Sequence, residues 1–338
     1  MKLKSIVISV FALLAVYSAY WYYIAENAEK HVAGIIERLE QDGVTLDYDG
    51  FEVTGFPYRF IFTLDKPKVT QTRGDMYSSW VSDQLNIYAQ PWGFTHLIFT
   101  SNASRLSIND NNNEGVFIDS ASMRLSYNMP KNNNSRISLE LTNSFASRFE
   151  DNSPILSTIN FAFHIRPSPG DTEASTSDLL APKLADIALG VEGLTIGKHT
   201  STKVIDELTL IANLRGGQAL MLSRAGLEGW RDGGGTLEIS QFDIIISGLD
   251  VKADGSLTLD QDLKPLGALS TKIATPQTAG VVLSRFINLD QQARDTLTSS
   301  LSLLQTFSSD GSIPLSLTAQ NGHLWLGPLR LTALPPIL

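Results

Sequence analysis

The residues of this sequence that could do chemistry are few and scattered. The chain has no Cys, which excludes disulfides, thiolate nucleophiles, iron–sulfur clusters and zinc sites with Cys ligands. It contains no Gly-rich phosphate loop and no GxSxG nucleophile elbow. No His has a second His at metal-ligand spacing, and the five are His31, His96, His164, His199 and His323. We therefore expect no catalytic residue, no metal and no cofactor, and only a dispersed carboxylate pair keeps an enzyme open as an alternative.

Two acidic stretches resemble ligand sites only in part. Asp110-x-Asn112-x-Glu114-Gly115 has the start of a calcium loop, but Ala121 occupies the twelfth position, where a bidentate Glu is required. We interpret this stretch as a polar hairpin turn. Asp42, Asp47 and Asp49 are interpreted as a solvated face.

The charge of the chain bears on its partners. The formal net charge is −9, and subtracting the two positive charges of Lys2 and Lys4 leaves −11 for everything after residue 25. A body this acidic is repelled by phosphate backbones, so we expect no nucleic-acid partner. An apolar content of 43% with 18% charged residues is typical of a folded chain.

The clearest feature is an apolar N-terminal segment. Residues 5–25 carry no charge, and as a helix they span roughly 31 Å, which matches a bilayer core. Lys2 and Lys4 precede the segment, so the positive-inside rule predicts a cytoplasmic N-terminus and export of the rest. Four aromatic residues near its end are predicted to lie at the membrane interface, namely Tyr20, Trp21, Tyr22 and Tyr23.

A cleaved signal peptide is the alternative to this anchor. It requires small residues around a cleavage site, and only Val16-Tyr17-Ser18 comes close. We prefer an uncleaved signal anchor. No second segment approaches about 18 uninterrupted apolar residues, so a single membrane pass is predicted.

Beyond residue 25 the patterns predict a helix and then mostly strands. Alternating apolar residues indicate an antiparallel meander, with further helices within 178–190, 218–230 and 278–307. The predicted organisation is an anchor (1–25), an N-terminal half with a helix and a β-meander (26–166), a linker (167–180) and a C-terminal half (181–338). The predicted fold class is α+β, with a long, curved, mostly antiparallel sheet and three or four helices packed on one side.

The stretch Gly55-Phe-Pro57 interrupts an early strand, and we expect a bulge there and at Gly248 to curve the sheet. Several strands are apolar on both faces, so one face must meet a second protein layer or a hydrocarbon ligand. The candidates for a lipid groove are Phe60, Phe62, Leu64, Phe161 and Phe163.

Several motifs occur in an order that resembles a known family. They are Gly55-Phe-Pro-Tyr-Arg-Phe60, Ala89-Gln-Pro-Trp92, Trp230 with Gly233-Gly-Gly-Thr-Leu237, Gly255-Ser-Leu-Thr-Leu-Asp260 with Pro265-Leu-Gly267, and Gly322-His-Leu-Trp-Leu-Gly-Pro328 followed by Leu334-Pro-Pro336. Together they resemble the domain of unknown function 2125 (DUF2125), an uncharacterised family of membrane-anchored envelope proteins of Gram-negative bacteria. The resemblance implies an inner-membrane location and supplies no functional residues.

The pattern of glycines and alternating apolar residues is more loosely similar to the AsmA-like group of anchored proteins with long curved sheets. That group is implicated in moving lipids between membranes, which is an analogy of fold. The resulting hypothesis is a periplasm-facing protein whose apolar groove binds or transfers lipid acyl chains. The alternative is a non-catalytic envelope scaffold or assembly adaptor that binds a protein partner and no lipid.

Overall fold

The computed structural model contains two compact units. Unit 1 comprises residues 1–129 and 139–155, and unit 2 comprises residues 130–138 and 156–338. Each unit has an antiparallel β-sheet and one described helix. The structure describes residues 3–110, 114–128, 135–168, 181–197, 203–217, 220–221, 223–274, 312–327 and 329–337, with 282, 291–292, 295–296, 299–300 and 303.

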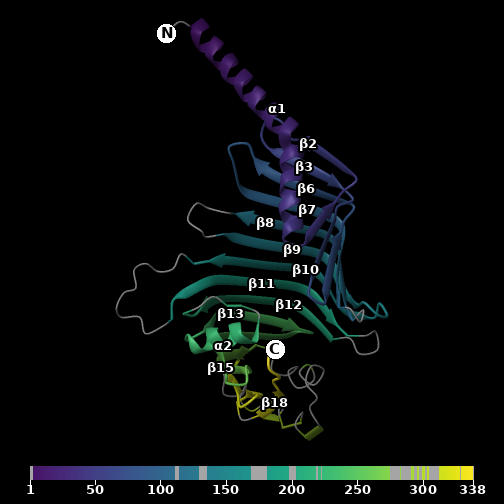
Figure 1. Ribbon diagram of the computed structural model, residues 1–338. Coiled ribbons are helices and arrows are strands. Elements are labelled where there is room, and N and C mark those ends of the chain that lie inside the picture. Colours follow the sequence, from purple (N-terminus) through teal and green to yellow (C-terminus); the bar gives the residue numbers. More distant parts are fainter. Residues whose placement is uncertain are drawn as a thin grey trace. The chain divides into compact units, whose positions relative to one another are not determined.

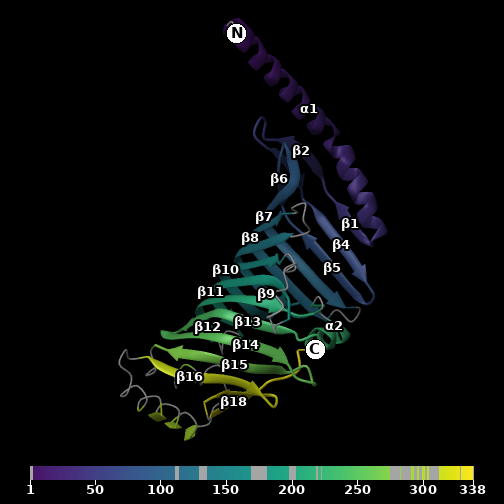
Figure 2. The same cartoon turned by 90° about the vertical axis from the view of Figure 1, so that its left-hand side faces the viewer.

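Unit 1 begins with a single long helix that continues directly into a β-meander. The predicted anchor and the predicted helix after residue 25 form one uninterrupted helix, and Figures 1 and 2 show its second half alongside the sheet of unit 1. The elements are α1 (Leu3–Gln41), β1 (Val44–Asp47), β2 (Gly50–Thr54), β3 (Phe60–Asp65), β4 (Lys68–Arg73), β5 (Met76–Val81), β6 (Gln84–Gln90), β7 (Gly93–Asp110), β8 (Gly115–Asn128) and β9 (Arg136–Arg148).

Short strands of unit 1 join end to end into long bent strands. β1 pairs with β4 and β2 with β3, while β5 pairs with β4 and β6 with β3. β7 then pairs with β6 through its first half and with β5 through its second half. The bends therefore lie side by side at 48–49, 66–67 and 82–83, with Ala103 of β7 at a positive φ of 51° between the two paired halves.

Hydrogen bonds join neighbouring bends. The backbone N–H of Lys66 donates to the carbonyl of Asp83 over 2.9 Å, and the Ser82 hydroxyl donates to the carbonyl of Asn102 over 2.9 Å. The Lys66 ammonium also lies 2.9 Å from the Asp49 carboxylate. That hydrogen bond raises the pKa of Lys66. The bends thus form one crease across the sheet.

The two predicted bulges are instead hairpin turns. Gly55-Phe-Pro57 joins β2 to β3, which pair directly, and the Arg59 N–H donates to the Gly55 carbonyl over 3.1 Å. Gly248 lies between β13 and β14, at a φ of 82°. Register shifts occur at other places, among them Ile211/Ala212 and Ile239/Phe242. The bulge prediction was wrong because a Gly that interrupts a run of alternating residues, with or without a nearby Pro, fits a turn as well as a bulge.

Unit 2 is an antiparallel meander with one short helix. Consecutive strands pair along its length, and α2 packs Leu227 and Trp230 on the apolar residues Leu214 and Leu263. The elements are β10 (Pro154–Pro167), β11 (Lys183–Ile196), β12 (Lys203–Arg215), α2 (Arg224–Asp232), β13 (Thr236–Ile246), β14 (Leu249–Leu259), β15 (Pro265–Ile273), β16 (Ile313–Gln320), β17 (His323–Leu326) and β18 (Leu329–Ala333).

The expected three or four helices on one side of the sheet are not found, because the described residues contain two helices, α1 and α2. The Ala/Leu-rich stretch 178–190, predicted to be partly helical, enters strand β11 from Lys183, where pairing with β10 and β12 overrides helix propensity. The helix predicted from residue 218 begins at Arg224, after Ser223 caps it. Most of the stretch 278–307, where a helix is predicted, and most of the linker 167–180 lie outside the described residues.

Candidate functional site

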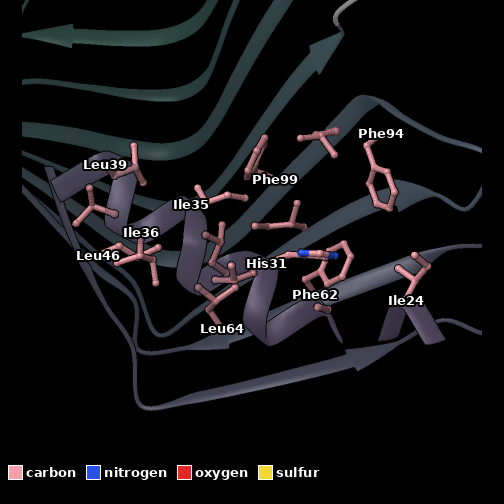
Figure 3. Close-up of a pocket in the computed structure, with 16 residues that line it drawn as sticks. Ile24, His31, Ile35, Ile36, Leu39, Leu46, Phe62, Leu64, Phe94 and Phe99 are labelled. Carbon is pink, nitrogen blue, oxygen red and sulfur yellow. The ribbon is translucent and has the colours of Figure 1, made fainter. Parts of the chain in front are cut away.

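An apolar cavity of about 550 Å³ lies between α1 and the creased sheet of unit 1. Side chains from the helix and from the strands are directed toward one another across it (Figure 3). The 16 lining residues are Ile24, Ala28, His31, Val32, Ile35, Ile36, Leu39, Leu46, Phe62, Leu64, Val69, Leu85, Ile87, Phe94, Leu97 and Phe99.

One face of α1 forms the roof of the cavity. Its lining residues recur three or four positions apart from Ile24 to Leu39, so they share one side of the helix over roughly 22 Å. Ala28 is buried, whereas Ile35 is 52% exposed although it lines the cavity. The cavity is therefore open to the surface along part of the helix.

The floor is built from cross-strand rows of the sheet. Phe62 of β3 pairs with Ile87 of β6, which pairs with Phe99 of β7, so three apolar side chains lie in one row on one face. Leu46 and Val69 are opposite each other on β1 and β4, beyond the crease. Both sides of the crease thus contribute lining residues, because the bend directs them toward the same helix.

The site has almost no polar chemistry. His31 is the only lining residue with a titratable side chain, and its side chain is exposed. Within the described part of the chain, no group of three or more His, Asp or Glu residues could hold a metal ion. At the calcium-like stretch, the N–H of Glu114 donates to Asp110 Oδ1 over 2.8 Å at the β7–β8 turn. The arrangement can hold hydrocarbon and offers no described catalytic group.

The three groove candidates on β3 have different surroundings. Phe62 and Leu64 line the cavity, although Leu64 is only 2% exposed. Phe60 is fully buried and lies outside the lining, because it is covered by the stacked rings of Trp21 and Phe94. The structure therefore brings two of these three residues to the cavity.

The other two groove candidates are in unit 2. Phe161 and Phe163 lie on one face of β10, opposite Val191 and Leu189 of β11, and both are half-buried. They line none of the cavity in unit 1. His164 is on the opposite face of β10 from Phe161 and Phe163, because successive side chains of a strand alternate between its two faces.

The predicted interface residues lie on α1 just before the cavity. Trp21 is buried at 4% exposure, and its indole N–H donates to the Arg59 carbonyl over 3.3 Å. The Tyr20 hydroxyl donates to the Pro91 carbonyl over 2.8 Å, and its side chain is 42% exposed. Tyr22 and Tyr23 are exposed.

Sequence reasoning did not assign the α1 residues to the site. The helix predicted after residue 25 rests on the apolar spacing of Ala28, Val32, Ile35, Ile36 and Leu39. The same apolar face of the helix is the signal that could have placed these residues over an apolar cavity.

The family model described as "Uncharacterized protein conserved in bacteria (DUF2125)" matches residues 21–335. The chain belongs to this family. The match begins at Trp21 and includes the strands of unit 1, α2 and the strands of unit 2, as well as the part of α1 that covers the cavity. Searches of curated proteins and of solved structures found no match. The family assignment confirms the resemblance seen in the ordered motifs, while the looser AsmA-like similarity stays a prediction.

Proposed function

We propose that this DUF2125 protein is a membrane-anchored envelope protein whose unit 1 cavity binds an acyl chain of a membrane lipid and exchanges it with the bilayer. The observation that carries the proposal is the lining, in which 15 of 16 residues are apolar. The position of the cavity adds support. The helix that covers it, α1, is the one described helix that is long and apolar enough to cross a membrane.

The dimensions of the cavity suit one chain. An acyl chain spans one leaflet of the bilayer core, which is roughly 15 Å thick. The lining face of α1 extends over roughly 22 Å, so it is long enough to cover one such chain. Each methylene removed from water contributes about 0.8 kcal/mol. An acyl chain that moves from the bilayer into an apolar cavity exchanges one apolar environment for another. The free energy of this transfer is therefore small, and binding is expected to be reversible. Reversible binding favours transfer over storage.

The test compares two substitutions on the same helix. Ala28→Trp puts a large side chain into the cavity, whereas Ala33→Trp puts the same side chain on an exposed position outside the lining. Native mass spectrometry of the full chain, released gently from membranes, should show phospholipid on the wild type and on Ala33→Trp. Ala28→Trp should lose most of it. Lipid held around the anchor is common to all three proteins and cancels in the comparison.

Equal lipid on the two Trp variants would overturn the proposal. Should Ala28→Trp lower the melting temperature, a photo-cross-linking residue at Ile35 replaces it, with Ala33 as the control position. Lipid adducts at Ile35 alone support the proposal, and equal adducts at both positions contradict it. The adaptor alternative would then describe the protein better, since α1 itself already buries Phe60.

The proposal includes the orientation of the chain. Lys2 and Lys4 precede the apolar segment, so the N-terminus is expected in the cytoplasm of a bacterium and both units in the periplasm. Because the chain has no Cys, Met76→Cys gives one thiol, at a 48% exposed position. A membrane-impermeant maleimide added to intact spheroplasts should label it. Labelling only after lysis would contradict this orientation.

A further inference from the structure

Two turns of unit 1 hold α1 upstream of the cavity. The β2–β3 turn, residues 55–59, accepts hydrogen bonds from Tyr17 at the Pro57 carbonyl and from Trp21 at the Arg59 carbonyl. The β6–β7 turn, residues 91–92, accepts one from Tyr20 at the Pro91 carbonyl. The first contacts between the helix and the sheet are therefore at Tyr17–Trp21.

The charge-free part of the helix before these contacts is too short to cross a bilayer alone. Every described side chain from Leu3 to Val16 is exposed, and the charge-free residues 5–16 span roughly 18 Å as a helix. The hydrocarbon core of a bilayer is about 30 Å thick, which leaves a deficit of roughly 12 Å. Tilting the helix reduces the depth that it spans and enlarges the deficit.

The surface of the two turns fits a lipid environment. Two large aromatic side chains on them are mostly exposed, Tyr58 at 81% and Trp92 at 76%. Phe56 and Phe94 are packed against other aromatic rings on one side and still have exposed fractions of 44% and 43%. Aromatic side chains of this kind favour the boundary between headgroups and hydrocarbon. Three turn carbonyls are already hydrogen-bonded by α1, which lowers the cost of moving them away from water.

The charge of the turns is also compatible with a membrane. Residues 55–60 and 89–94 contain no acidic residue, and Arg59 is their only charged side chain. Its guanidinium lies 5.3 Å from the ring centroid of Tyr88 and is exposed, so it can extend from an apolar surface toward lipid phosphates.

We propose that the β2–β3 and β6–β7 turns insert into the leaflet nearest unit 1, so that the aromatic turns and α1 together complete the span of the bilayer. Phe94 also lines the cavity, so insertion brings this end of the cavity to the leaflet. The inference requires α1 to cross the membrane and does not depend on a lipid in the cavity.

Site-directed spin labelling tests the insertion directly, because the chain has no native Cys. Tyr58→Cys and Trp92→Cys are spin-labelled in the full chain, reconstituted in vesicles of zwitterionic and anionic phospholipid. Met76→Cys is the control, at the β4–β5 hairpin that follows the strand paired with β1. β1 comes directly after α1, so this hairpin lies near the far end of the helix.

The measurement is the accessibility of each label to oxygen, which concentrates in hydrocarbon, and to a polar nickel complex, which stays in water. Labels at positions 58 and 92 should show several-fold lower nickel accessibility and higher oxygen accessibility than the label at position 76. Nickel accessibility equal at all three positions would overturn the proposal. Because the chain is otherwise wild type at the cavity, this result is independent of the Ala28→Trp comparison.

Discussion

Trp21→Ala should separate α1 from the sheet of unit 1. Trp21 is 4% exposed, stacks on Phe60 with ring centroids 5.2 Å apart and meets the edge of Phe56 at 5.4 Å. Truncating a buried Trp typically costs about 3–5 kcal/mol, and here the indole hydrogen bond to Arg59 is lost as well. Residues 24–41 would lose the contact that positions them over the cavity.

Thermal unfolding and hydrogen exchange of the full chain in mild detergent measure the effect. Trp21→Ala should lower the melting temperature and accelerate exchange in the second half of α1. Tyr23→Ala is the matched control, since Tyr23 lies on the same helix and is 65% exposed, and it should change neither quantity appreciably. Trp21→Phe should be intermediate, because it retains ring stacking without the N–H. If Trp21→Ala behaves like Tyr23→Ala, the helix is held by other contacts.

Gly255→Ala should destabilise unit 2 more than any ordinary strand substitution. Gly255 on β14 has a φ of 150°, and an added Cβ would lie 2.3 Å from the carbonyl oxygen of Ala268 on the paired strand β15. Gly267 on β15 has the reciprocal arrangement, with a Cβ 2.2 Å from the oxygen of Ser256. Backbone atoms cannot move aside as a flexible side chain does. Strain and overpacking together are expected to cost roughly 3–5 kcal/mol.

Gly190→Ala is the matched control for this prediction. Gly190 lies within strand β11 of the same unit, its φ is not positive, and the nearest atom to an added Cβ is that of Ala162 at 4.0 Å. It should be neutral or slightly stabilising. Urea unfolding of the two variants gives the comparison. A Gly255→Ala midpoint as high as that of Gly190→Ala would show that the β14–β15 pair tolerates a side chain there.

The glycine pair also explains part of the family resemblance. Gly255 and Gly267 both belong to the ordered motifs that identified the family from the sequence. The register places them across from Leu269 and Leu257, where each strand passes close to the backbone of the other. A motif with no chemistry of its own therefore reflects a close approach of two backbones.

The sequence alone determined the features that depend on local pattern. A charge-free segment of membrane length predicted the first half of α1, and apolar spacing predicted the second half. Alternation predicted most strands, including β3, β8, β13 and β15, because side chains on a strand have a period of two. Local pattern failed at residues 183–190, where helix-forming residues are held in β11 by pairing on both sides.

Only the tertiary structure decided which apolar faces meet. Phe60 and Phe62 share one strand face and look equivalent in sequence, yet Trp21 covers the first and the second lines the cavity. No local pattern in the sequence predicts the crease, because its bends are aligned by pairing between different strands. Local periodicity gives each element its apolar side. Whether that side is sealed or left open depends on long-range packing, and here the sheet bends around one helix and leaves an apolar space beneath it.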